Sequence, residues 1–201
     1  MKNTKKIICA MLAIFMLLSF AACGEKGGDP ASFIVNSTSE SGSGDLSEDV
    51  KINIPVALID EKYQDDIDAF CSEYGFEKGK SNSDGTVTVK KDALSYNLLL
   101  TRIGMQTIQK IYAVAEDGDF PYVKGIQSYD DKDFAAVSVL VNREKYSSAK
   151  DPALMRLSIV KSCLIYQAFA GIEEPKFTLT VVDNKTKETI EEKTYTSADI
   201  Q

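Results

Sequence analysis

Residues 24–49 constrain this chain most, because they cannot contribute to a hydrophobic core. They contain five of the 12 Gly residues, six Ser and alternating acidic residues, and their only apolar cluster is Phe33-Ile34-Val35. Such a composition buries too little apolar surface to offset the entropy of folding. It predicts a flexible linker, with a coil reach of about 28 Å. The linker separates an N-terminal segment from residues 50–201. That stretch has a length typical of one domain.

The start segment, residues 1–22, has the pattern of an export signal. Lys2, Lys5 and Lys6 precede an apolar run from Ile7 to Leu18, and small residues follow. The run has 12 residues, whereas a membrane-spanning helix needs roughly 20. A basic start, a short apolar run and a small-residue end together predict a signal peptide.

The end of this segment, Phe20-Ala21-Ala22-Cys23-Gly24, resembles the lipobox of bacterial lipoproteins, with Phe20 where that family usually has Leu. The resemblance implies cleavage before Cys23 and a diacylglyceryl group on its sulfur. The lipid attachment site would then be Cys23, in the predicted linker region 23–49. Membrane lipid would be a partner, and the location would be the outer face of the cytoplasmic membrane. Two alternatives stay open: Ser19-Phe20-Ala21 as an ordinary secretory cleavage site, and an uncleaved anchor.

Composition excludes several classes of function. The chain has no His, so Ser-His-Asp catalysis, His-ligated zinc and a His pH switch are ruled out within it. Removal of residues 1–22 would leave 20 basic and 30 acidic side chains, a net charge of −10. Because that field repels phosphate backbones, we expect no nucleic-acid partner.

Apolar periodicity and turn residues predict one α+β domain over residues 50–201, with about three helices on a largely antiparallel sheet. The order is a strand, then a helix plus a hairpin three times, with no parallel crossover required. Pro55 marks the first strand as an edge strand or a bulge. The strands are predicted at 51–58, 76–80, 86–89, 122–128, 134–141, 177–182 and 189–195. The helices are predicted at about 67–74, 93–116 and 152–170, with Asp151 as the cap of the third.

The domain resembles small lipoproteins of Gram-positive, clostridial-type bacteria. The similar stretches are 52–55, 84–88 and 166–171. That group has no assigned activity, so the resemblance implies location and fold and does not imply a chemical reaction.

The third predicted helix has an apolar arc of roughly 220°, wider than a surface helix needs. The helix is therefore either packed on two sides or in contact with a partner through part of the arc. The residues of the arc are Met155, Leu157, Ile159, Val160, Cys163, Leu164 and Tyr166.

Three groups of residues were considered as metal or catalytic sites. Asn82-x-Asp84-Gly85 resembles part of a calcium loop, but Lys80 and Lys91 fall where ligands are needed, which favours a hairpin turn. The acidic clusters at 65–68 and 130–133, which include Asp65, Asp66 and Asp68 and Asp130, Asp131 and Asp133, are interpreted as solvated turns. Ser147-x-x-Lys150 and Ser158-x-x-Lys161 lack the other elements of penicillin-recognising enzymes. We predict no catalytic residues, no metal site and no cofactor.

Two cysteines fall within the predicted domain, Cys71 and Cys163, and both lie on predicted core faces. There they are either small buried apolar residues or, in an exported protein, the two halves of a disulfide.

These observations favour a membrane-anchored extracytoplasmic lipoprotein whose domain binds or associates and does not catalyse. An accessory subunit or ligand sensor of a membrane complex is the first alternative, docking a membrane or cell-envelope protein through the third helix or the edge near Pro55. A carboxylate-based, metal-assisted hydrolase is the second, and it needs three or more acids to converge.

Overall fold

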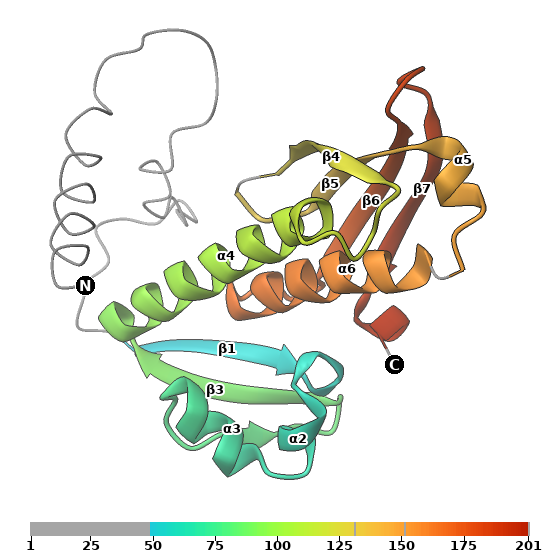
Figure 1. The fold of residues 1–201 in the computed structure, drawn as a ribbon. Helices are drawn as coiled ribbons and strands as arrows, with labels where there is room; N and C mark the ends of the chain where they lie inside the picture. The colour runs from blue at the N-terminus through green and yellow to red at the C-terminus, as the bar shows by residue number, and fades with distance from the viewer. Residues whose placement is uncertain (1–48, 131, 151, 201) are drawn as a thin grey trace, which may run out of the picture. The chain divides into compact units, whose positions relative to one another are not determined.

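The structure is a computed structural model that describes residues 49–130, 132–150 and 152–200. The predicted signal peptide, Cys23 and nearly all of the predicted linker lie outside these residues, as do Asp131 and the predicted cap Asp151. The first strand begins at Asp49, one residue before the predicted start of the domain. The described fold is α+β, as predicted, with two mostly antiparallel sheets and helices packed on them (Figure 1).

The first sheet has three antiparallel strands in the order β1 (Asp49–Pro55), β3 (Thr86–Asp92), β2 (Lys80–Ser81). Strand β1 is an edge strand, as Pro55 predicted, and the 3-10 helix η2 (Val56–Leu58) follows it. Ile52 lies opposite Val89 and Ile54 opposite Val87, and all four are buried. One face of this sheet is therefore apolar.

Two short helices lie in the connection between β1 and β2. They are α2 (Glu61–Gln64) and α3 (Ile67–Tyr74), and α3 ends at Gly75 with φ at 63°. Helix α3 lies close to the sheet: a Cβ atom at Gly79, just before β2, would lie 2.8 Å from the sulfur of Cys71 on α3 and 3.2 Å from Cγ1 of Val87 on β3. The predicted helix at 67–74 is thus confirmed, and its apolar residues face the three-stranded sheet.

The second sheet has four strands in the order β4 (Val123–Tyr129), β5 (Ala136–Val141), β6 (Lys176–Asp183), β7 (Thr189–Thr196). The β4–β5 and β6–β7 pairs are antiparallel, as the predicted hairpins require. Strands β5 and β6 pair in parallel. The connection between them runs through α5 (Arg143–Ser147) and α6 (Pro152–Phe169).

Two details of the prediction were therefore wrong. The hairpins do not share one sheet, and β5–α6–β6 is a parallel crossover. Parallel strands need a long connection, usually a helix, and the third predicted helix is that connection. Alternating side chains locate a strand but do not reveal which strand lies beside it.

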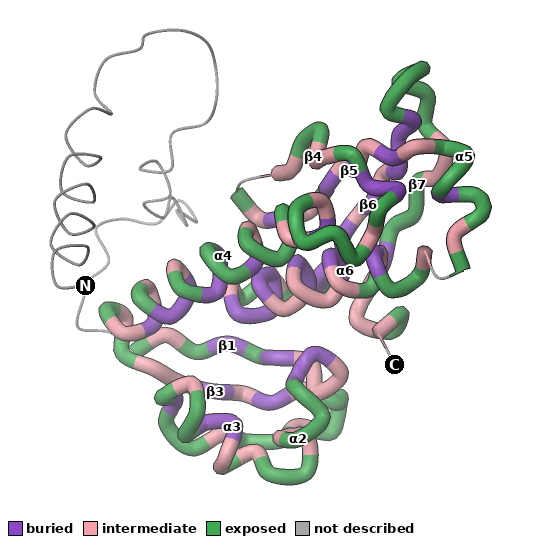
Figure 2. Tube along the Cα trace, viewed as in Figure 1, coloured by how far each residue is buried: buried purple, intermediate pink, exposed green. Residues whose placement is uncertain are grey.

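Helices α4 (Ala93–Glu116) and α6 lie side by side and antiparallel, and each contacts both sheets (Figure 1). The Thr107 hydroxyl donates to the Ser162 carbonyl at 3.4 Å near their middle, and the Tyr96 hydroxyl donates to the Phe169 carbonyl at 2.8 Å at one end. This two-sided packing accounts for most of the wide apolar arc of α6, whose inner residues are buried (Figure 2). None of the helices described is long and apolar enough to cross a membrane.

Candidate functional site

A shallow groove lies beside α6, where this helix meets β7 and the C-terminal 3-10 helix η3 (Ser197–Ile200). It encloses about 280 Å³. We call it the α6 groove. Its lining residues are Ala153, Leu154, Arg156, Leu157, Val160, Lys193, Tyr195, Asp199 and Ile200.

The apolar side of the α6 groove comes from Leu157, at the outer edge of the predicted arc, and from Leu154, which lies outside that arc. Leu154 is 56% exposed and Leu157 is 44% exposed, whereas Val160, which also lines the groove, is buried. Burying such side chains is favourable by up to a few kcal/mol each. The arc predicted from the sequence is thus mostly core, and Leu157 at its outer edge is exposed.

The opposite wall of the groove is held in place by Asp199. Its carboxylate accepts from the Thr196 amide at 2.9 Å and from the Thr196 hydroxyl at 3.1 Å, and these hydrogen bonds lower the pKa of Asp199. Lys193 lies 3.5 Å from Asp199 and 4.5 Å above the centre of the Tyr195 ring. These contacts fix η3 against the end of β7, so the groove is preformed.

Behind the groove, Arg156 belongs to a three-residue polar cluster. It donates to the Tyr146 hydroxyl at 3.0 Å and to Glu191 at 2.9 Å, and the Tyr146 hydroxyl also donates to Glu191 at 2.8 Å. Burial, reinforced by the Glu191 carboxylate, raises the pKa of Tyr146 to about 12. Each charged group here is paired within the domain, so the cluster connects α5, α6 and β7.

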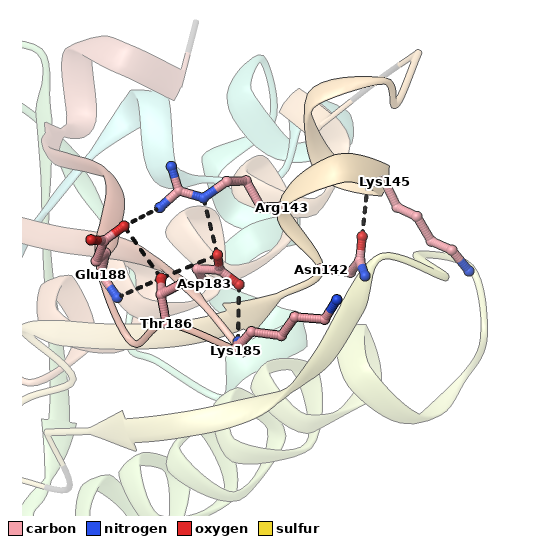
Figure 3. A network of polar contacts seen from close by, with 7 residues as sticks. All are labelled: Asn142, Arg143, Lys145, Asp183, Lys185, Thr186 and Glu188. Atoms are coloured by element: carbon pink, nitrogen blue, oxygen red, sulfur yellow. Dashed lines mark hydrogen bonds and ion pairs between the residues drawn. The ribbon is translucent and has the colours of Figure 1, made fainter.

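A second polar network ties α5 to the β6–β7 turn (Figure 3). The Arg143 guanidinium donates to Asp183 and to Glu188, each at 3.0 Å. Asp183 also accepts from the Lys185 amide at 2.9 Å and from the Thr186 hydroxyl at 3.2 Å. A buried carboxylate is costly unless it is paired, and these contacts supply the pairing. We interpret the network as structural.

This network predicts an acid-dependent loss of stability. The amide of Lys185 and the guanidinium of Arg143 lower the pKa of Asp183 below its ordinary value of 3.8. A depressed folded-state pKa contributes stability that is present above the ordinary value and is lost as the pH falls through the folded value. In urea denaturation, Asp183→Asn should therefore be less stable than wild type at neutral pH, with the gap closing below about pH 4. The exposed variant Asp119→Asn controls for the lost charge, and a gap independent of pH would contradict the assignment.

The residues considered as metal or catalytic sites do not converge. Among the described residues, no three acidic or cysteine side chains are grouped closely enough to hold a metal ion. Asp66 caps α3 by accepting from the Ala69 amide at 2.9 Å. Asp84 accepts from the Thr86 amide at 3.0 Å in a turn where Gly85 has φ at 79°, which confirms the hairpin-turn interpretation. Asp130 accepts from the Lys132 and Ala135 amides, while Asp131 lies outside the described residues.

A larger hollow of about 620 Å³ lies between the C-terminal half of α4, the following loop and α6. Its lining is mixed in charge, and Ser158 of the Ser-x-x-Lys pattern is part of it, whereas Lys161 is not. The lining residues are Gln106, Gln109, Lys110, Ala113, Val114, Asp117, Asp119, Phe120 and Ser158.

Cys71 and Cys163 are both buried and both free, so the disulfide weighed from the sequence is not formed in this structure. Cys71 lies on α3, against the three-stranded sheet, and Cys163 lies within α6. Burial raises the pKa of each thiol, and the thiolate is the reactive form.

We therefore expect a maleimide to leave Cys71 and Cys163 unlabelled in the native protein and to label both after unfolding without reductant. Peptide mapping by mass spectrometry separates them from the other cysteines. Labelling that requires prior reduction would contradict the free thiols seen here.

Comparisons with known proteins identify no relative of this chain: no family model, no curated protein and no solved structure matches it. Sequence reasoning found Leu157 and Val160 of the α6 groove. It missed Leu154, Lys193, Tyr195 and Asp199. The hairpin of β6 and β7 was predicted, but the packing of α6 against β7 and η3 was not.

Proposed function

We propose that this chain is a bacterial lipoprotein, tethered through Cys23 to the outer face of the cytoplasmic membrane, whose domain binds another envelope protein. The tether is supported by the residues around Cys23, which combine a basic start, a short apolar run and Ala-Ala-Cys. Two acyl chains on one residue give stable attachment, where one chain holds only marginally. The domain acts by association, with no chemical step assigned to it.

The α6 groove is the observation that supports a binding role. Leu154 and Leu157 are exposed at its edge, the aromatic ring of Tyr195 forms part of its lining, and η3 is held in place by Asp199. Exposed apolar side chains beside a preformed hollow are typical of a protein contact. The partner that fits is a protein segment that inserts one or two apolar side chains and meets Lys193 with an acidic group.

The proposal is tested by site-specific photo-cross-linking in intact cells, with a photoreactive amino acid at Leu157. We expect one adduct of discrete mass. The adduct should disappear in a second variant, Leu154→Asp, whose charge lies in the groove. It should persist with Ser83→Asp, which adds the same charge at an exposed position of the β2–β3 turn. Docking at the groove would be contradicted if the adduct still formed in Leu154→Asp. It would also be contradicted if no adduct formed although the protein was tethered to the membrane.

A ligand sensor is the second candidate, and the 620 Å³ hollow beside α4 favours it. Its size falls in the range of small-molecule sites, which is roughly 300–1,000 Å³. Gln106, Gln109 and Lys110 supply donors and Asp117 and Asp119 supply acceptors. A thermal-shift screen of small polar metabolites, repeated with Gln109→Leu, would support this role only if the shift were lost in the variant.

A further inference from the structure

Helix α4 carries an apolar stripe on the side that faces away from the core. Leu94 is 64% exposed, Leu98 66%, Met105 57% and Tyr112 38%. A helix turns about 100° per residue, so these four side chains fall within about 40° of one another and span about 27 Å of its length. We call them the α4 stripe. The buried residues of α4, such as Ile103 and Thr107, point in roughly the opposite direction.

The charge around the α4 stripe differs from that of the rest of the molecule. The chain has 30 acidic and 23 basic residues, yet residues 93–115 contain no acid and two cations, Arg102 and Lys110. At 100° per residue, Arg102 lies about 40° around the helix from Leu98, beside the stripe, whereas Lys110 lies about 120° away. Exposed leucines beside a cation are typical of helices that lie in the interface of a membrane. Because the acids of α4 are confined to its ends, at Asp92 and Glu116, the stripe avoids much of the repulsion that anionic headgroups exert on the rest of this protein.

The predicted tether joins the domain at one end of this stripe. Asp49, the first described residue, is the register partner of Asp92, and Asp92 caps the N-terminus of α4 by accepting from the Ser95 amide at 2.9 Å. Leu94 and Leu98 therefore lie within the first two turns from the point where the chain arrives from Cys23. The residues between Cys23 and Asp49 have a predicted reach of only about 28 Å.

From these observations we propose that the α4 stripe rests on the surface of the lipid bilayer, an inference that depends on the proposed tether. Leu94, Leu98 and Met105 would enter the boundary between headgroups and acyl chains, to a depth of about 5–10 Å. Tyr112 suits this position because its ring is apolar and its hydroxyl is polar. A weak surface affinity is enough, because a short tether supplies an effective concentration in the millimolar range. The α6 groove is a separate surface and stays available for a protein.

The test uses the full lipoprotein in vesicles of phosphatidylethanolamine and phosphatidylglycerol. An environment-sensitive fluorophore is attached to Leu98→Cys, with Ser83→Cys in the exposed β2–β3 turn as the control. The native Cys71 and Cys163 are buried and do not compete for the label. The vesicles carry a quencher on lipid at the headgroup boundary, and flotation on a density gradient reports attachment.

We expect the protein to float with the vesicles, with lipid quenching at position 98 and none at position 83. Flotation with equal or absent quenching at both positions would overturn the bilayer contact and leave the tether intact. The bilayer contact would also be overturned if the fluorophore at position 98 were shielded from solvent and two labelled copies could be cross-linked to each other. The stripe would then cover a second copy of the chain. Failure to float would overturn the proposed tether, and the bilayer contact with it.

Discussion

Replacing Phe169 by alanine is expected to lower the free energy of unfolding by about 4 kcal/mol, since truncating a buried Phe typically costs 3–5 kcal/mol. Phe169 is 3% exposed at the end of α6. Its ring centre lies 6.2 Å from that of Phe70, 5.1 Å from Tyr74 and 5.9 Å from Phe76. The side chain thus joins α6 to α3 and to the segment that follows α3. The cavity left by its removal would lie between elements distant in the sequence.

Urea denaturation followed by circular dichroism measures this effect. We expect a lower midpoint with an unchanged slope, because the surface exposed on unfolding stays the same. Leu98→Ala is the control: this leucine is 66% exposed, and surface substitutions usually change stability by less than about 0.5 kcal/mol. A loss below about 1 kcal/mol for Phe169→Ala would contradict the packing described.

Replacing Gln167 by leucine is expected to cost about 3 kcal/mol, because the removed amide leaves buried backbone groups without partners. Gln167 is 2% exposed. Its side-chain nitrogen donates to the carbonyls of Phe134 and Lys176 at 3.2 and 2.9 Å, and its oxygen accepts from the Lys176 amide at 2.8 Å. These bonds hold α6 to the segments that lead into β5 and β6, which are the two parallel strands.

The same denaturation experiment tests this prediction, with Gln109→Leu as a matched change at an exposed position of α4. Hydrogen exchange adds a local readout: the Lys176 amide should lose protection in Gln167→Leu before the middle of β6 does. A Gln167→Leu protein as stable as wild type, with Lys176 still protected, would show that the side chain does not hold the crossover.

The sequence predicted the local elements well where capping and turn residues agree with apolar spacing. The helix predicted at 93–116 is α4, which has the same bounds. Pro152 begins α6, and Gly171, with φ at 77°, follows its end. The Asp-Gly turn at 84–85 joins β2 to β3, as its residues indicate. These signals are local, so no knowledge of the rest of the fold was needed.

The pairing of β5 with β6 could not be predicted in the same way. The valines of β5 alternate with less buried residues whether their neighbouring strand is parallel or antiparallel. The separation into two sheets also depends on which faces α4 and α6 cover. The short helix α5 was missed, because its five residues show no apolar period.

The candidate site was only half predictable for a related reason. The wide apolar arc of α6 indicated that this helix does more than cover one sheet, and Leu157 was part of that arc. Nothing in the sequence places Lys193 and Asp199 beside it. Their position beside α6 follows from the packing of this helix against the β6–β7 hairpin and from the hydrogen bonds of Asp199 to Thr196.

Lipid tethering through Cys23 is tested most directly by comparing wild type with Cys23→Ala in cell fractions and by intact mass. We predict wild-type protein in the membrane fraction, with a mass that corresponds to a chain beginning at Cys23 and carrying a diacylglyceryl group. The Cys23→Ala protein should be either unprocessed or released. Membrane retention and processing that are unchanged in Cys23→Ala would contradict the account.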